Sequence, residues 1–334
     1  MPSLLDPIFL RNLKIRNRIV MPPMATELST RDGEVTEKLI QHYVKRSRDV
    51  GLVIIEHSYV SGNGKLSDHQ LGIYCDRLIE GLSRLSKKIK ENGAAVIIQI
   101  NHAGGKASSR IIGETPIAPS SIKIPGGNEN PREMNFKDLM EVKDAFREAA
   151  RRAVEAGFDG VEIHGAHGFL LNQFTSPITN RRIDAYGGNP AKRMKFPLEI
   201  VEEVRRMLGE DKILLYRIGA VDLLPGGLTV EESMKFALKL EEYGVDVIDV
   251  SGGLCGSRPP SLAGQGYFIP IAEKIKNVVG IPVIGVGGIK DPLYADEIVR
   301  SGRVDLVAVG RAMLNDPDWA SKAIETLRKI EADS

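Results

Sequence analysis

The sequence predicts one α/β domain, a (β/α)8 (TIM) barrel with an N-terminal β-hairpin cap, over residues 1–334. Three observations favour this fold. A glycine followed by a β-branched run recurs after charged amphipathic stretches, polar residues stand where those runs end, and no G-x-G-x-x-G follows the first run. The first two are typical of a parallel sheet whose strands end at a common site, and the third argues against an open dinucleotide-binding sheet.

The glycine-initiated runs account for five strands, and three further apolar runs complete the eight. Each run is short enough to be a strand buried on both faces. Each leading glycine suits the end of a helix, where the backbone needs φ > 0. The repeats are GLVIIE (51–56), GAAVIIQ (93–99), GFDGVEIH (157–164), GVDVIDVS (244–251) and GRVDLVAVG (302–310), and the other runs are 18–21, 213–218 and 282–286.

The segments between these runs are predicted to be helices, loops and one hairpin. In Lys137–Ala156 apolar residues recur every three or four positions, as in a helix with one face packed on a barrel. Pro7–Asn17 is predicted to be a small hairpin that plugs the bottom of the barrel. The long connections Gly104–Asn135 and Gly252–Gly266 are rich in Gly and Pro, and we expect them to be active-site loops.

Composition points to a small-molecule partner. Lys and Arg number 45 against 44 Asp and Glu, so no strong field of one sign favours nucleic acid or a membrane surface. The two cysteines, Cys75 and Cys255, are far apart and form no zinc, iron–sulfur or disulfide pattern. The first residues show no basic region followed by an apolar run and a cleavage site, and no run of about 18 apolar residues occurs. From these patterns we expect a cytoplasmic protein.

Glycines near the C-terminus predict a phosphate site. Gly285–Gly288 follows the seventh strand and Gly310–Arg311 follows the eighth, and barrels of this kind usually hold phosphate at those two loops. Backbone N–H groups and a guanidinium would converge there. The alternative is that these glycines only make tight turns.

Four polar residues stand at other strand ends: Gln99, His164, His167 and Arg217. An amide and a cation are the groups that a flavin ring requires, the cation near its N1 and O2 atoms. For Arg217 the alternative is a structural ion pair at the mouth of the barrel.

The two histidines share a strand-end loop, where their imidazoles could hydrogen-bond one substrate oxygen and stabilise charge that develops on it. A metal half-site completed by His102 or Glu162 is the rival, although catalytic zinc usually has three protein ligands and we expect the Glu162 side chain to point elsewhere. A buried structural histidine is the remaining alternative for either residue alone.

At these residues the chain resembles the old yellow enzyme family of NADH:flavin oxidoreductases over essentially its full length, as a single-domain bacterial or archaeal-type member. The motifs that carry the resemblance are Asn17 through Met24 (NRIVMPPM), Ile98-Gln99, His102-Ala103-Gly104, Glu162 through Phe174 with His164-Gly165-Ala166-His167-Gly168, Ser176-Pro177, Asn180, Arg182, Asp184, Tyr186-Gly187-Gly188, Arg193, Arg217 and Gly310-Arg311.

The resemblance implies one FMN-binding domain and a ping-pong cycle. NADH or NADPH reduces noncovalent FMN, and the flavin N5 then passes hydride to an electron-poor alkene while His164 and His167 hold the substrate carbonyl as the catalytic pair. The residues implied to contact the ring or ribityl chain are Pro22, Pro23, Met24, Ala25, His57, Gln99 and Arg217, and those implied to hold the phosphate are Gly287, Gly288, Gly310 and Arg311. No metal is implied.

Three positions depart from the family pattern. Phe169 stands where the family usually has a proton-donating tyrosine, and a benzyl group has no proton to give. Ala25 replaces a frequent cysteine near the flavin, and Glu27 replaces a frequent substrate-contacting tyrosine. Glu27, Phe169 and Tyr267 complete the expected substrate-binding set with the two histidines. The proton is then expected from solvent or from another group, with Glu27, Tyr267 and Cys255 as candidates.

The sequence therefore also allows other electron acceptors, namely quinones, nitro compounds and dienoyl thioesters. A further alternative is that the protein is a flavin-binding module with little turnover. The cysteine content predicts no internal iron–sulfur relay of the kind that larger relatives carry, and the C-terminal residues lack the ending with which some relatives complete a neighbour's site. The sequence does not choose between NADH and NADPH, and homo-oligomerisation stays open.

Overall fold

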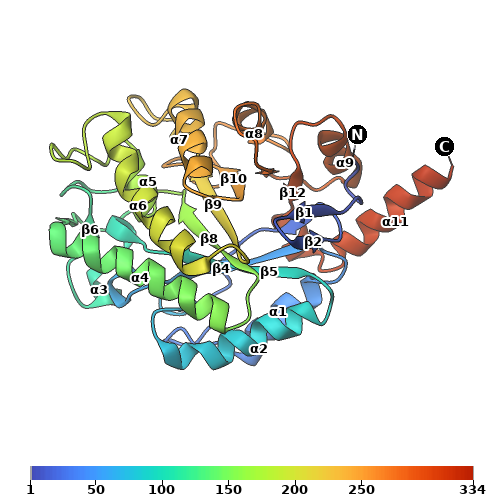
Figure 1. The fold of residues 1–334 in the computed structure, drawn as a ribbon, viewed down its shortest axis with the longest axis horizontal. Coiled ribbons are helices and arrows are strands. Elements are labelled where there is room, and N and C mark those ends of the chain that lie inside the picture. Colours follow the sequence, from blue (N-terminus) through green and yellow to red (C-terminus); the bar gives the residue numbers. More distant parts are fainter. Residues whose placement is uncertain (1, 334) are drawn as a thin grey trace.

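Eight parallel strands close into a barrel in the computed structural model, which describes residues 2–333 (Figure 1). Closure is made by β12 pairing with β3, where Val307 lies opposite Ile19. The predicted fold class is thereby confirmed. In barrel order the strands are β3 (Ile19–Met21), β4 (Leu52–Tyr59), β5 (Ala95–Asn101), β8 (Gly160–Gly165), β9 (Ile213–Gly219), β10 (Val247–Ser251), β11 (Val283–Gly285) and β12 (Leu306–Ala308).

The predicted hairpin is formed by β1 (Ile8–Leu10) and β2 (Leu13–Ile15), which pair antiparallel. Leu10 and Ile15 are buried in one cluster with barrel-interior residues such as Val20, Leu52 and Leu215. Burial of these apolar side chains holds the hairpin against the barrel interior. The prediction of a plug at the end of the barrel opposite the strand carboxyl ends is consistent with this packing.

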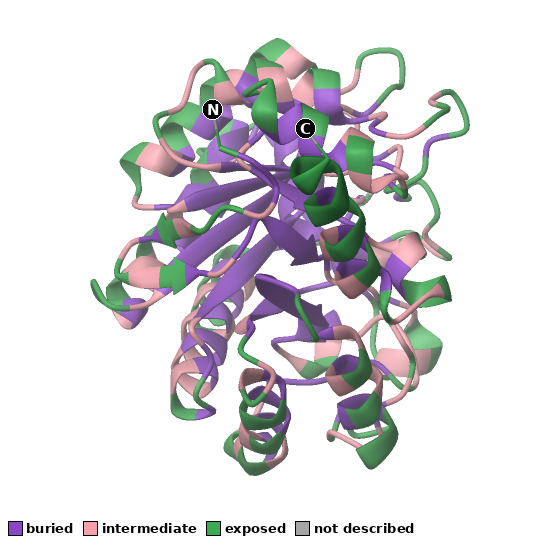
Figure 2. Ribbon diagram, turned by 90° about the vertical axis from the view of Figure 1, so that its right-hand side faces the viewer, coloured by how far each residue is buried: buried purple, intermediate pink, exposed green. Residues whose placement is uncertain are grey.

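Helices cover the outside of the barrel, with their buried faces toward the strands (Figure 2). The predicted stripe of α4 is confirmed, since Leu139, Val142 and Phe146 are buried. The long helices are α1 (Glu37–Arg46), α2 (Ile79–Lys90), α4 (Phe136–Glu155), α6 (Pro190–Leu208), α7 (Val230–Glu242), α8 (Ile269–Lys276), α9 (Pro292–Arg300) and α11 (Trp319–Ala332). The shorter helices are α3 (Ser109–Ile112), α5 (Leu170–Thr175) and α10 (Arg311–Asn315), with η1 (Gly62–Gly64), η2 (Asp76–Leu78) and η3 (Gly104–Lys106).

Four of the five leading glycines have the predicted left-handed backbone: Gly93, Gly157, Gly244 and Gly302 all have φ between 74° and 90°. The prediction was wrong for Gly51, which is not among the positive-φ residues. A Cβ at Gly51 would lie 2.2 Å from the carbonyl oxygen of Asn17. Close approach of two chain segments, and not the backbone angle, therefore requires glycine there.

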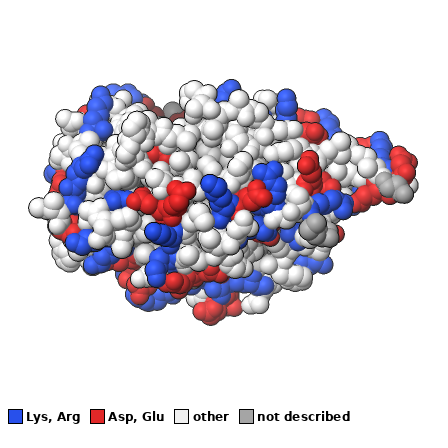
Figure 3. All heavy atoms as spheres, turned by 90° about the horizontal axis from the view of Figure 1, so that it is seen from above, with Lys and Arg blue, Asp and Glu red and all other residues white. Residues whose placement is uncertain are grey.

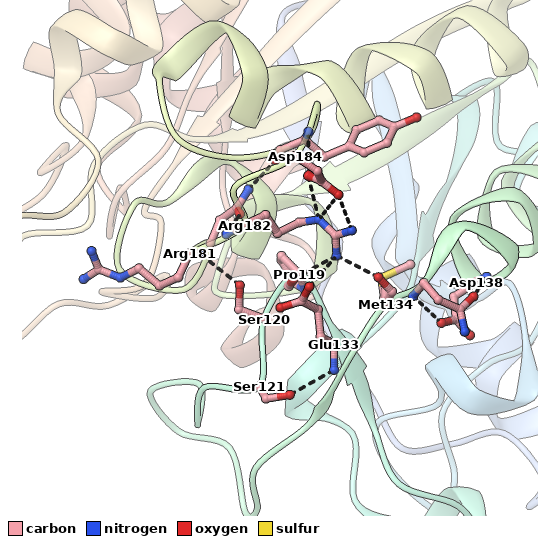
Figure 4. A network of polar contacts seen from close by, with 12 residues as sticks. Pro119, Ser120, Ser121, Glu133, Met134, Asp138, Arg181, Arg182 and Asp184 are labelled. Atoms are coloured by element: carbon pink, nitrogen blue, oxygen red, sulfur yellow. Dashed lines mark hydrogen bonds and ion pairs between the residues drawn. The ribbon is translucent and has the colours of Figure 1, made fainter.

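Hydrogen bonds from Arg182 hold the connection 104–135 in place (Figure 4). It includes the two-stranded sheet of β6 (Ile117–Ala118) and β7 (Arg132–Glu133). The Arg182 guanidinium donates to the carbonyls of Pro119 (3.0 Å) and Met134 (2.7 Å), and it pairs with Asp184 at 2.6 Å. The connection is therefore tied to the segment after α5 at Pro119 and Met134.

We expect Arg182→Met to lower the free energy of unfolding by about 2–4 kcal/mol, because two buried carbonyls lose their donor. Chemical denaturation of both proteins measures the difference. Ile183→Ala is the matched control, since that neighbouring side chain is 99% exposed, and it should change the free energy by less than about 0.5 kcal/mol. An equal loss of unfolding free energy in the two variants would contradict a stabilising role for these Arg182 hydrogen bonds.

Surface charge is mixed in sign over the face shown in Figure 3, where Lys and Arg alternate with Asp and Glu. This agrees with the formal net charge of +1. Within residues 2–333, no helix combines the length and the apolar character needed to cross a membrane.

Candidate active site

A cavity of about 490 Å³ lies where the carboxyl ends of the barrel strands converge. Parallel strands bring residues that are distant in sequence to one rim, which is why segments from Pro22 to Arg311 meet here. The lining residues are Pro22, Pro23, Met24, Ala25, His57, Gln99, Lys106, His164, His167, Phe169, Arg217, Gly256, Ser257, Arg258, Tyr267, Val286, Gly288, Gly310 and Arg311.

All but two of the residues expected from sequence line this cavity. The exceptions are Gly287 and Glu27. The Gly287 carbonyl accepts from the N–H groups of Gly266 (2.5 Å) and Tyr267 (3.3 Å), which braces the loop beside the cavity. Glu27 is exposed and accepts from the Ser67 hydroxyl at 2.5 Å. Glu27 therefore does not line the cavity, although its carboxylate interacts electrostatically with His57, which does.

One end of the cavity is a cradle of glycines beside a guanidinium. Gly288 has φ +67°, and a Cβ there would lie 3.0 Å from Arg311 Nη2. A Cβ at Gly310 would lie 3.2 Å from the sulfur of Met24. Arg311 donates to the Tyr267 hydroxyl at 3.3 Å, and Tyr267 donates in turn to the Ser257 carbonyl at 2.8 Å. Small residues beside a cation fit a phosphate group.

The inner wall of the cavity carries Gln99 and Arg217, each backed by a buried carboxyl group. Gln99 Nε2 donates to Glu162 at 2.8 Å, and Arg217 Nε lies 3.1 Å from Asp249. Arg217 therefore forms the ion pair considered as its alternative and also faces the cavity. The expectation that Glu162 points elsewhere was wrong, because residues two apart on a strand share a face and Glu162 and His164 both point into the barrel.

His164 and His167 are brought together at the cavity wall, with ring centroids 5.1 Å apart and planes at 86°. Burial lowers the pKa of both imidazoles well below the usual value, so both are neutral near pH 7. The Ala166 N–H donates to His164 Nδ1 at 3.2 Å, which leaves the proton on Nε2. His167 Nε2 lies 2.7 Å from the Ser251 hydroxyl. The pair is therefore equipped to donate hydrogen bonds, not to carry positive charge.

The metal alternative has little geometric support. Both ring nitrogens of His102 already have hydrogen-bond partners. Its Nδ1 accepts from the Gly104 N–H at 2.9 Å, and its Nε2 lies 3.1 Å from Asn63 Oδ1. Glu162 is bonded to Gln99. Across residues 2–333, no group of three or more His, Cys, Asp or Glu side chains is arranged to hold a metal ion.

Among the residues that the sequence did not single out, Lys106 lines the cavity and Ser251 contacts a lining residue. Lys106 Nζ donates to the His167 carbonyl at 2.7 Å and lies 5.4 Å from the centre of the Phe169 ring. Burial lowers the pKa of Lys106. Ser251 orients His167 from the end of β10. Ser251 ends a predicted strand, so its position was a signal that could have found it, whereas Lys106 lies inside the predicted loop 104–135.

Among the proposed proton donors, Cys255 does not line the cavity. Its thiol lies 3.2 Å from the Val221 carbonyl, and burial raises its pKa to about 11. Tyr267 lies at the phosphate-like end, with its hydroxyl already bonded to Ser257. Phe169 is 7% exposed and packs edge-on against His164 with ring centroids 4.8 Å apart.

We expect His57→Gln to reduce the loss of stability between about pH 7 and pH 5. Burial lowers the pKa of His57 to about 4, so below about pH 6.5 the unfolded chain takes up a proton that the folded one refuses. Folding stability then falls by roughly 1.4 kcal/mol per pH unit for this histidine, which is about 2 kcal/mol at pH 5. Urea unfolding at both pH values measures the effect.

Buried carboxyl groups change the stability in the opposite direction as the pH falls. They are present in both wild type and His57→Gln, so the difference between the two proteins reports the contribution of His57. Burial raises the pKa of Glu56 to about 7, so its contribution to stability is lost as pH rises. An identical pH dependence in wild type and His57→Gln would contradict the prediction.

Comparisons with known sequences agree with this geometry. The model of the NADH:flavin oxidoreductase / NADH oxidase family matches residues 3–329. An NADH oxidase of Thermoanaerobacter brockii is 44% identical over 331 residues, which are 97% of this chain and 51% of that protein. An NADPH dehydrogenase of Geobacillus sp. (strain WCH70) is 43% identical over 326 residues, which are 97% of this chain and 94% of that protein.

Solved structures share the architecture. A 2-naphthoyl-CoA reductase complex has a TM-score of 0.93 at 26% identity and covers 97% of this chain and 52% of its own. An old yellow enzyme homologue from Zymomonas mobilis has a TM-score of 0.86 at 27% identity, with coverage of 97% and 93%. Morphinone reductase in complex with tetrahydroNAD has a TM-score of 0.85 at 26% identity, with coverage of 98% and 91%. The chain spans about half the length of the NADH oxidase and of the 2-naphthoyl-CoA reductase.

Proposed function

The chain belongs to the NADH:flavin oxidoreductase / NADH oxidase family, an FMN-binding family of the old yellow enzyme type, and we propose that it uses NADH or NADPH to reduce electron-poor alkenes such as enones. One observation carries this proposal. A single cavity joins a glycine cradle with Arg311, an inner wall with Gln99 and Arg217, and a pair of neutral histidines. We further propose that residues 1–334 form one FMN-binding domain and that the protein is cytoplasmic.

The lining residues fit FMN. Gly288, Gly310 and Arg311 would hold the phosphate, where an added Cβ would close the cradle. The ring would lie along Gln99 and Arg217, with the stretch Pro22–Ala25 and His57 around it. When bound, FMN supplies the hydride chemistry, since it accepts hydride from a nicotinamide and passes it to the acceptor.

The two histidines would bind the substrate carbonyl. Their N–H groups donate to the oxygen, and a neutral donor stabilises the negative charge that develops there without ionising itself. Lys106 holds the backbone of His167, so the loop that presents the pair is fixed. The buried Phe169 ring excludes water from one side of His164.

The test is anaerobic reduction followed by a panel of acceptors. We expect the purified protein to be yellow, to bleach with NADH or NADPH, and to recover its colour when an enone is added. Nitroalkenes, quinones and dienoyl thioesters complete the panel. A colourless protein that does not take up added FMN would overturn the proposal, and a flavin that stays oxidised with both nicotinamides would favour a binding module.

We expect Phe169→Tyr to accelerate enone reduction by prereduced protein, because a phenol beside His164 supplies the missing proton donor. Positioned proton transfer contributes about 10²–10⁴-fold, so an increase of at least about tenfold is expected where protonation limits the rate. Anaerobic stopped-flow measures the rate of colour recovery. Phe169→Leu is the control without a hydroxyl, and an unchanged rate in Phe169→Tyr would show that protonation at this position is not limiting.

Phe169 also favours a second set of acceptors. Quinones and nitro compounds require no proton at carbon, so the missing phenol would cost them less. Faster colour recovery with these acceptors than with any enone would make them the preferred class.

A further inference from the structure

Two carboxyl groups, those of Glu162 and Asp249, lie within hydrogen-bonding reach of each other in the barrel interior, next to the cavity-lining residues Gln99 and Arg217. Glu162 on β8 and Asp249 on β10 are both 0% exposed. Glu162 Oε1 accepts from Gln99, and Asp249 faces Arg217, so each carboxyl group supports one cavity-lining side chain. The layer beneath them is apolar and includes Ile97, Leu215 and Val247.

The hydrogen bonding is incomplete if both groups are ionised. Within residues 2–333, Glu162 Oε2 and both Asp249 oxygens then accept no hydrogen bond. A proton on Glu162 changes this, because its carboxyl group can donate to Asp249. Burial and the neighbouring carboxylate raise the pKa of Glu162 well above its usual value.

Charge leads to the same arrangement. Arg217 on β9 is the cation that faces the pair. The imidazoles that interact electrostatically with Arg217 are those of His57, His164 and His167, and burial lowers the pKa of each, so they add no positive charge near pH 8. Two adjacent carboxylates in a low-dielectric interior cannot both ionise readily against one guanidinium. One negative charge on the pair balances Arg217.

We propose that Glu162 and Asp249 share a single proton and act as a positioning pair that orients Gln99, balances Arg217 and sets the redox potential of bound FMN. The role toward FMN rests on the proposed function. Because reduction places negative charge on the ring, an unbalanced Arg217 would favour the reduced cofactor, and the single negative charge of the pair limits that preference.

The shared proton predicts an unusual pattern among neutral variants. In Glu162→Gln or Asp249→Asn the remaining carboxyl group ionises, so the charge beside Arg217 stays at one and the potential changes little. The double variant removes that charge. We expect it to prefer reduced FMN at least tenfold more strongly than wild type, a rise of about 30 mV for a two-electron couple.

Potentiometric titration of the FMN-loaded variants at about pH 8 measures this pattern. A tenfold shift in each single variant would show that both groups are ionised, and no shift in the double variant would show that both are neutral, so either result overturns the shared proton. If the double variant does not fold, a tenfold shift in a single variant still overturns the proposal. Its absence excludes two ionised groups, and a protonated carboxyl band that survives in the single variants would then overturn the proposal by showing two neutral groups.

Infrared spectroscopy of the FMN-free protein tests the pair independently of the cofactor. Wild type should show the C=O band of a protonated, buried carboxyl group at about pH 8, and each single variant should lose it. Glu56→Gln is the control, because Glu56 is a buried carboxyl group with its own partners, Thr26 and Tyr43, and its substitution should leave the band. A wild-type protein without the band overturns the shared proton even if FMN binds, whereas a band in a protein that never binds FMN contradicts the proposed function alone.

Discussion

His164→Ala is expected to lower kcat/KM for an enone by about 10²–10³-fold, the usual effect of removing one preorganised donor from a developing oxyanion. The donor is preorganised here because the Ala166 N–H occupies Nδ1 and burial keeps the ring neutral. Steady-state rates measure the loss, with NADH or NADPH, whichever reduces the wild-type flavin, at saturating concentration. A similar loss is expected for His167→Ala, whose ring is held by Ser251.

The exposed His69 supplies the control, since it lies outside the cavity lining. His69→Ala should retain wild-type turnover, and the FMN content of every variant should be checked so that a lost cofactor is not mistaken for a lost donor. Enone turnover that survives in both cavity variants would remove the histidine pair from the proposed mechanism.

Arg311→Ala is expected to weaken FMN binding by about 10–150-fold, which corresponds to roughly 1.5–3 kcal/mol for hydrogen bonds to a charged group. Arg311 is the guanidinium beside Gly288 at the phosphate-like end, and it also donates to Tyr267. Fluorescence titration of FMN into the apoprotein measures the dissociation constant.

Arg303→Ala is the matched control, because Arg303 lies outside the cavity and pairs with Glu273 at 3.0 Å. It should leave FMN affinity unchanged. Equal affinity in Arg311→Ala and wild type would mean that the phosphate is held elsewhere.

Much of the fold was predictable because its signals are local. A strand buried on both faces needs an apolar run, and a helix that ends in a left-handed residue needs glycine, as at Gly93 and Gly157. Helix α4, on the outside of the barrel, was predictable from the three- and four-residue spacing of its apolar residues. Gly51 shows the limit of this reasoning, since its requirement comes from Asn17 on a neighbouring segment.

The candidate site was predictable where residues stand at strand ends, as do Gln99, His164 and Arg217. Glu27 was expected with them, but its side chain is exposed and is bonded to Ser67. Lys106 was not anticipated as a cavity residue, because its place depends on how the chain turns after β5.

The order of amino acids by itself determined the eight strands and the family to which the chain belongs, because each depends on spacing along the chain. The exact strand ends differ from the predicted ones, since β4 continues to Tyr59 and β5 to Asn101. Only the tertiary structure decided that Glu162 and Asp249 stand together behind Gln99 and Arg217, and that Glu27 lies outside the cavity. Such neighbours come from different strands and loops. Their contacts depend on barrel closure and strand register, which no local pattern records.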